Sequence, residues 1–121
     1  MDRQVVFGDL KGLVLSEVKQ QGDEIHFTVN DGRKFRLLHI QDCCEYVNIE
    51  DVCGDLSDLV GTPILMAEEA TSNEMPEGIS IPPESFTWTF YKMATVKGYV
   101  TIRFYGESNG YYSESVDFLE G

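Results

Sequence analysis

The fold is decided by one segment, Glu24-Ile25-His26-Phe27-Thr28-Val29-Asn30-Asp31-Gly32-Arg33-Lys34-Phe35-Arg36-Leu37-Leu38-His39. On both sides of Asp31-Gly32, apolar side chains recur at every second position, which is the pattern of a strand with one face toward a core. An Asp-Gly pair supplies the positive backbone dihedral that a tight turn needs. The segment therefore predicts two antiparallel strands joined by a short turn.

The same alternation recurs along the rest of the chain, with little helical periodicity. We expect strands at 13–22, 24–29, 34–39, 46–52, 63–70, 86–91, 99–105 and 111–118. The segment 63–70 is also compatible with a helix, and 71–84, which contains three prolines, is expected to be a surface loop. One short helix is expected near residues 55–60, capped by Asp55 and ended by Gly61. The prediction is a mainly β protein, an antiparallel meander of seven to eight strands that forms a barrel or a sandwich.

The three C-terminal strands carry enough apolar residues to predict which face is buried. The expected inward residues are Phe86, Trp88 and Phe90, then Val100, Ile102 and Phe104, and finally Tyr112, Val116 and Phe118. A turn near 96–98 would make the first two strands neighbours. Their opposite faces would then form two adjacent rows, Thr87, Thr89 and Tyr91 beside Tyr99, Thr101, Arg103 and Tyr105.

Length and charge limit the possible classes of protein. A chain of 121 residues with 42% hydrophobic residues can bury one core, so residues 1–121 are expected to form a single β-rich domain. The net charge is −12 and there are nine basic residues, which disfavours nucleic-acid or anionic-membrane partners. No segment approaches the roughly 18 apolar residues that cross a bilayer. The carboxylates are most simply explained as a solvated surface.

The middle of the chain is its most acidic part. No lysine or arginine occurs between Leu37 and Tyr91, a stretch that contains eleven carboxylates and all three cysteines. An odd number of cysteines favours a reducing, cytoplasmic location. Negative surroundings disfavour a cysteine nucleophile, and we predict no catalytic residue. The alternatives for the cysteines are burial as small apolar groups or a zinc site, whose ligands would be His39, Cys43, Cys53 and Asp42 or Glu45.

A candidate ligand-binding surface lies in the C-terminal half. Aromatic rings and a few donors there have the chemistry to stack a planar base and hold one or two phosphates. Cross-strand packing between tyrosine and threonine explains the same pattern without a ligand. The candidate residues are Tyr91, Lys92, Arg103, Tyr105, Asn109 and Tyr111.

Four blocks of sequence resemble a family of small uncharacterised proteins carried by bacteriophages and prophages. They are Gln41-Asp42-Cys43-Cys44-Glu45, Ile49-Glu50-Asp51-Val52-Cys53-Gly54-Asp55-Leu56, Phe86-Thr87-Trp88-Thr89-Phe90-Tyr91-Lys92 and Ser108-Asn109-Gly110-Tyr111-Tyr112-Ser113. The resemblance extends from about Gly8 onward. It implies a phage-derived protein that acts inside a bacterial host, and it assigns no activity to any residue.

Three functions compete in that setting. The first is a non-enzymatic binding module that acts on a host protein or sequesters a small signalling molecule, with self-association through an exposed strand edge. The second is a metal-binding domain centred on residues 39–55. The third is an acidic decoy that imitates DNA, which is disfavoured because the aromatic alternation commits much of the chain to a core. The binding module is the leading hypothesis.

Overall fold

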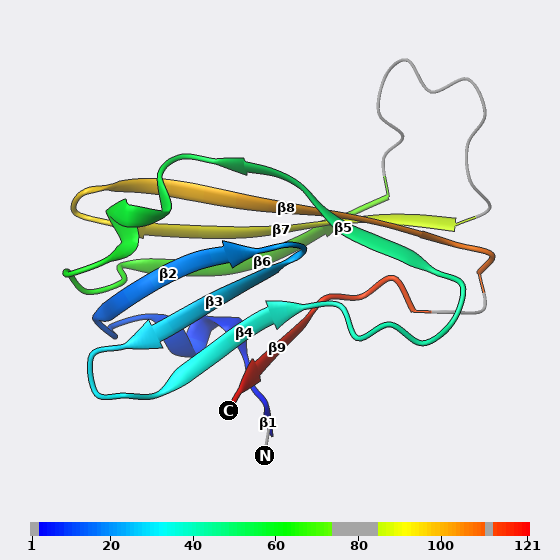
Figure 1. The fold of residues 1–121 in the computed structure, drawn as a ribbon. Helices are drawn as coiled ribbons and strands as arrows, with labels where there is room; N and C mark the ends of the chain where they lie inside the picture. Colours follow the sequence, from blue (N-terminus) through cyan, green and yellow to red (C-terminus); the bar gives the residue numbers. More distant parts are fainter. Residues whose placement is uncertain (1–2, 74–84, 111–112) are drawn as a thin grey trace.

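The computed structural model describes residues 3–73, 85–110 and 113–121, and it shows two antiparallel β-sheets packed face to face (Figure 1). The first sheet has the order β1-β9-β4-β3-β2, with bounds Arg3–Gln4, Asp117–Glu120, Lys34–Leu38, Glu24–Val29 and Leu15–Gln21. The second has the order β5-β8-β7-β6, with bounds Tyr46–Cys53, Gly98–Ser108, Ser85–Thr95 and Met66–Ser72. The mainly β prediction is confirmed, and the two separate sheets make the architecture a sandwich.

The central hairpin forms as its sequence predicts. β3 and β4 pair antiparallel with Phe27 opposite Phe35. The turn between them is closed by the Val29 amide, which donates to the Arg33 carbonyl at 2.8 Å. Gly32 has a φ of 96°, a conformation that residues with a Cβ rarely adopt. The Asp-Gly pair thus fixes the register that puts the apolar residues of both strands on one face.

Long-range pairings complete the two sheets. The meanders β2-β3-β4 and β6-β7-β8 follow chain order, whereas β5 crosses to pair with β8 and β9 returns to lie between β1 and β4. The edge strands β2 and β5 each contain a register shift, between Leu15 and Glu17 and between Ile49 and Asp51. The remaining edges are β1, which has two residues, and β6.

The core lies between the sheets and is rich in aromatic rings. The 3-10 helix η1 (Phe7–Leu10) closes one side of it with Phe7 and Leu10, and Phe7 lies 4.8 Å from the Tyr91 ring between centroids. Phe118 of β9 stacks on Phe35 at 5.3 Å. Burial of this apolar surface is the main stabilising contribution to such a fold. The fully buried residues of both sheets include Leu15, Ile25, Phe27, Leu37, Tyr91, Met93, Val100, Ile102 and Phe104.

The inward face of β7 is the opposite of the one expected from its sequence. Thr89, Tyr91 and Met93 are buried, whereas Phe86, Trp88 and Phe90 are only half-buried on the outer face. The reason is the register with β8, which places Thr89 opposite Phe104 and Met93 opposite Val100. The prediction that Val100, Ile102 and Phe104 face inward is confirmed, and paired residues of neighbouring strands share a face.

Shorter elements also agree with the sequence in part. The 3-10 helix η2 (Leu56–Leu59) begins where Asp55 accepts a hydrogen bond from the Ser57 amide at 2.9 Å, as expected of its cap. The segment 63–70 contains the start of β6, so the strand alternative is correct. The last strand was expected at 111–118, but β9 begins only at Asp117, and Tyr112 lies outside the described residues. Within the described ranges, every helix is too short and too polar to cross a membrane.

Candidate functional site

Three of the six predicted ligand-binding residues lie together on the outer face of the second sheet. Lys92 of β7 and both Arg103 and Tyr105 of β8 point away from the core, because the alternate residues of these strands face inward. Trp88 is directly opposite Tyr105 in the register. We call Asn48, Trp88, Lys92, Arg103 and Tyr105 the contact face.

A cluster of two aromatic rings and one guanidinium forms the centre of the contact face. The rings of Trp88 and Tyr105 are 4.7 Å apart between centroids, and the Arg103 guanidinium carbon lies 5.0 Å from the Trp88 ring centroid. A guanidinium over an indole is attracted by the negative face of the ring. Burial and the neighbouring Glu107 carboxylate raise the pKa of Tyr105 to about 12, so its hydroxyl stays protonated and donates to Glu107 at 3.0 Å.

Among the described residues, two buried polar atoms of the contact face have no hydrogen-bond partner. They are Arg103 Nε, a donor, and Asn48 Oδ1, an acceptor on the neighbouring strand β5. Asn48 lies opposite Tyr105, and Asp51, which is opposite Arg103, holds the guanidinium only at 3.8 Å. Buried polar atoms are almost always satisfied, so an unpaired donor and acceptor on one face suggest a place for a bound molecule.

The other predicted ligand-binding residues are distributed differently. Tyr91 is fully buried on the inner face, so the expected row of Thr87, Thr89 and Tyr91 does not lie beside the Arg103 row. Burial, reinforced by the negative charge of Glu69, raises the pKa of Tyr91. Asn109 is exposed just beyond the end of β8, and Tyr111 lies outside the described residues.

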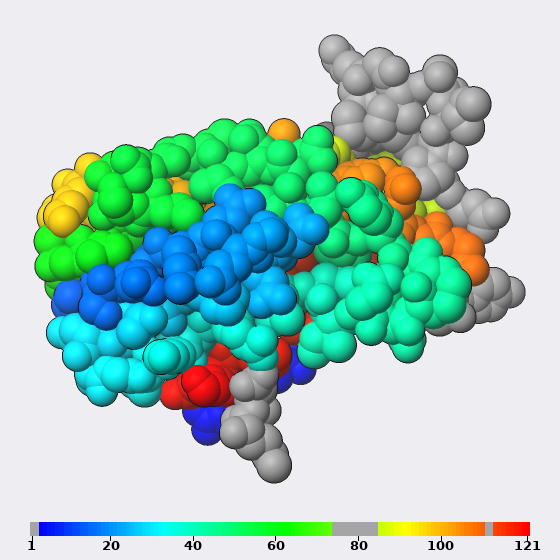
Figure 2. Space-filling view, viewed as in Figure 1, coloured from blue at the N-terminus to red at the C-terminus, as the bar shows by residue number. Residues whose placement is uncertain are grey.

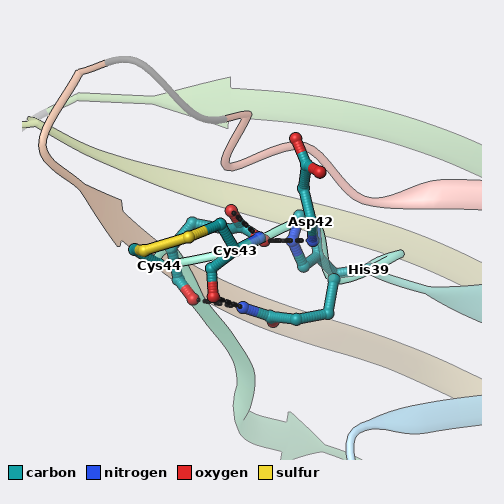
Figure 3. Close-up of a disulfide and its surroundings, with 6 residues drawn as sticks. His39, Asp42, Cys43 and Cys44 are labelled. Atoms are coloured by element: carbon teal, nitrogen blue, oxygen red, sulfur yellow. Dashed lines mark hydrogen bonds and ion pairs between the residues drawn. A yellow bond between two sulfur atoms is a disulfide. The ribbon is translucent and has the colours of Figure 1, made fainter.

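A buried carboxylate organises the loop that joins β4 to β5. Glu45, with a side chain that is 0% exposed, accepts the Asp42 amide at 2.6 Å and the Cys43 amide at 3.3 Å (Figure 3). His39 holds the same carboxylate at 3.2 Å and the Ser115 carbonyl at 2.6 Å through its other ring nitrogen. In Figure 2 this teal segment lies beside the orange end of β8, in agreement with the pairing of Tyr46 with Glu107.

The Glu45 carboxylate should make the stability of the protein depend on acid pH. The Asp42 amide, together with His39 and the Cys43 amide, lowers the pKa of Glu45 from 4.5 to about 2. A carboxylate with a depressed folded-state pKa stabilises the protein above its unfolded value of 4.5 and loses that contribution as the pH falls toward 2. We expect Glu45→Gln to lower the thermal midpoint at pH 7 and the difference from wild type to shrink between pH 4.5 and 2.

Thermal unfolding followed by circular dichroism across this pH range provides the measurement. Glu17→Gln, which removes an exposed carboxylate from β2, is the control. A pH-independent difference for Glu45→Gln, or the same profile in both variants, would contradict the role of Glu45 as the anchor of the loop.

The structure does not bring the predicted zinc ligands together. The Cys43 sulfur is bonded to that of Cys44, and it offers no thiolate to a metal while that bond is intact (Figure 3). Cys53 lies at the far end of β5, roughly 20 Å along an extended strand from the loop. Asp42 and His39 remain near Cys43, but no group of three His, Cys, Asp or Glu residues suited to a metal ion occurs within 3–73, 85–110 and 113–121. The four residues are close in the sequence, but the fold keeps Cys53 apart from the other three.

The expectation that one or two of the cysteines are buried is wrong, because Cys43, Cys44 and Cys53 are all exposed. The thiol of Cys53 donates to the Asp51 carboxylate at 3.1 Å. That hydrogen bond, with the negative charge of Asp51, raises the pKa of Cys53, so the thiol is not activated as a nucleophile.

Comparison with known proteins provides a family and no named activity. Neither a curated protein nor a solved structure matches the chain. A family model does match, over residues 8–118, and covers nearly the whole chain. The chain therefore belongs to DUF7448, a domain family of unknown function.

Proposed function

We propose that this protein is a non-enzymatic binding module that sequesters a small signalling molecule on the contact face, and that the ligand belongs to the nucleotide class. The observation that carries the proposal is the unpaired Arg103 Nε beside the Trp88 and Tyr105 rings, which are in contact and tilted by 55° to each other. A nucleotide combines the two features that this arrangement recognises, a planar ring for stacking and an anion for the guanidinium.

A second cation strengthens the case for an anionic ligand. Lys92 lies two residues from Phe90, which is opposite Arg103, so its ammonium is on the same face as the guanidinium. Glu68 is opposite Lys92 in the register with β6, yet within the described ranges the two side chains do not form an ion pair. Two cationic side chains, Lys92 and Arg103, thus lie on the same face as the aromatic pair.

Fluorescence titration tests the proposal, because Trp88 is the single tryptophan of the chain. We expect adenosine monophosphate to quench Trp88, adenosine to bind about tenfold more weakly because it lacks the charge-assisted contact, and inorganic phosphate to leave the signal unchanged. Lys92→Gln should weaken the affinity for the nucleotide by about the same factor.

Lys34→Gln is the matched control, since it removes the same charge from an exposed position on the first sheet. If Lys92→Gln and Lys34→Gln weaken the affinity for the nucleotide equally, the loss comes from long-range charge attraction. That result would contradict a binding site on the contact face. Absence of quenching by the nucleotide at millimolar concentration would overturn the nucleotide class.

We place this module in the cytoplasm of a phage-infected bacterium. The four sequence blocks that resemble phage proteins support the origin, and the exposed free thiol of Cys53 is typical of a reducing compartment. In that compartment the exposed Cys43–Cys44 bond would be open to thiol exchange. Recovery of the chain from the periplasm of infected cells would contradict this location.

A further inference from the structure

β7 carries two further aromatic rings on the outer face of the second sheet, and a site for one nucleotide does not use them. Phe86 and Phe90 lie two residues before and two residues after Trp88, and both are half-buried. Because alternate residues of a strand share a face, the three rings form one row, roughly 7 Å apart along the strand. Rings left partly in water lose part of the free energy of burial, so this row indicates a surface that a bound molecule covers.

Charge distinguishes the two ends of the row. Phe90 is opposite Arg103 in the register with β8, and Lys92 follows it on the same face. At the other end, Phe86 is opposite Glu107. The two cations attract a phosphate, whereas the carboxylate repels one. An anionic ligand that extends beyond the indole ring therefore extends toward Phe90.

The guanidinium of Arg103 is placed to hold the phosphate that links two nucleosides. It lies 5.0 Å from the Trp88 ring centroid, and Arg103 is directly opposite Phe90. Its Nε is buried and, among the described residues, has no hydrogen-bond partner, while the Asp51 carboxylate approaches the guanidinium only at 3.8 Å. A phosphodiester oxygen would supply the missing acceptor.

We propose that the ligand of the contact face is a dinucleotide, with one base at Trp88, the linking phosphate at Arg103 and the second base at Phe90. The inference rests on the proposed function and names its ligand more closely. The roughly 7 Å between alternate side chains is about twice the 3.4 Å rise between bases in a duplex. The two bases are therefore unstacked from each other, and each can stack on an aromatic ring of the protein.

Acidic residues limit the length of this ligand. Glu107 is opposite Phe86 at one end of the row, and Glu68 is opposite Lys92 at the other. Together with the net charge of −12, they disfavour the additional phosphates of a longer strand. The site thus fits two bases and one linking phosphate.

Titration of the full chain with two ligands of equal charge, followed by Trp88 fluorescence, tests the proposal. One ligand is the dinucleoside monophosphate ApA. The other is the methyl ester of adenosine monophosphate, which has the same singly charged phosphodiester and lacks the second base. We expect ApA to bind about tenfold more tightly, which is the effect of stacking one base on an aromatic side chain. The trinucleotide ApApA should give no further gain of this size.

Phe90→Leu locates the second base. The change keeps apolar bulk and removes the flat ring, so the ratio of affinities between ApA and the ester should fall to about one. Phe86→Leu is the matched control, because it makes the same change at the other neighbour of Trp88 and should keep the ratio of about tenfold. Circular dichroism verifies the fold of both variants, and the comparison of ligands in the wild type requires no variant.

Equal affinity of ApA and the ester in the wild type would overturn the proposal, because one base would then fill the site. A ratio that changes equally in the two phenylalanine variants, or only in Phe86→Leu, would contradict a second base at Phe90. A further gain for ApApA would contradict the limit of two bases. In each case binding of adenosine monophosphate would still support the nucleotide class, whereas its failure to quench Trp88 would overturn both proposals.

Discussion

Phe118→Ala is expected to lower the free energy of unfolding by about 3–5 kcal/mol, the cost of deleting a buried aromatic ring that its neighbours cannot replace. Phe118 is 3% exposed, and its ring lies 5.2 Å from Phe7, 5.3 Å from Phe35 and 6.0 Å from Phe27. These contacts join β9 to η1, β4 and β3, so the cavity left by alanine would open between four elements. Chemical denaturation measures the change.

Phe86→Ala is the control for the same deletion on the outer face of the second sheet. Phe86 is half-buried there, so we expect a loss of only roughly 1 kcal/mol. The comparison also tests the face assignment of β7. Equal losses in the two variants would contradict an outward-facing Phe86 and would favour the inward face that the sequence alternation predicts.

Gly54→Ala is expected to destabilise the protein by roughly 3 kcal/mol, because a left-handed backbone and a steric clash combine at one position. Gly54 has a φ of 105°, and a Cβ there would lie 2.4 Å from the Tyr99 carbonyl oxygen and 3.2 Å from the Val100 Cα. Both of those atoms belong to the backbone of β8, which cannot move without disturbing its pairing with β5. Thermal and denaturant unfolding measure the loss.

Gly12→Ala separates the two causes. Gly12 has a similar φ of 90°, but a Cβ added there would meet no atom within 4 Å, so only the backbone cost of about 1–2 kcal/mol should remain. A Gly54→Ala variant no less stable than Gly12→Ala would show that the close approach of the Gly54 and Tyr99 backbones is not tight in solution.

Local signals predict the fold wherever one residue type determines a backbone conformation. Asp31-Gly32 predicts the hairpin, and Asp55 the start of η2. The pairing of β5 with β8 and the insertion of β9 are not predictable, since no local pattern encodes a partner distant in sequence. The segment 86–91 alone predicts the wrong face of β7, because its largest apolar side chains point outward. Met93, two residues beyond Tyr91, continues the buried row and is the signal that corrects the face.

The candidate site is predictable to a similar extent. Lys92, Arg103 and Tyr105 are expected on one surface and are found there. The large apolar ring of Trp88 suggests a core residue, and nothing in the segment around Asn48 shows that β5 lies beside β8.

The register shifts in β2 and β5 have a consequence for copies of the chain at high concentration. A strand from another molecule that docks on either edge would lose its alignment where the extra residue interrupts the ladder. On the third long edge, β6 presents the adjacent carboxylates Glu68 and Glu69, and like charges would repel the same strand of a second copy. These edges are therefore expected to resist fibril growth, and they also oppose the self-association through a strand edge that we expect from the sequence, so crowded samples should remain clear without a chaperone.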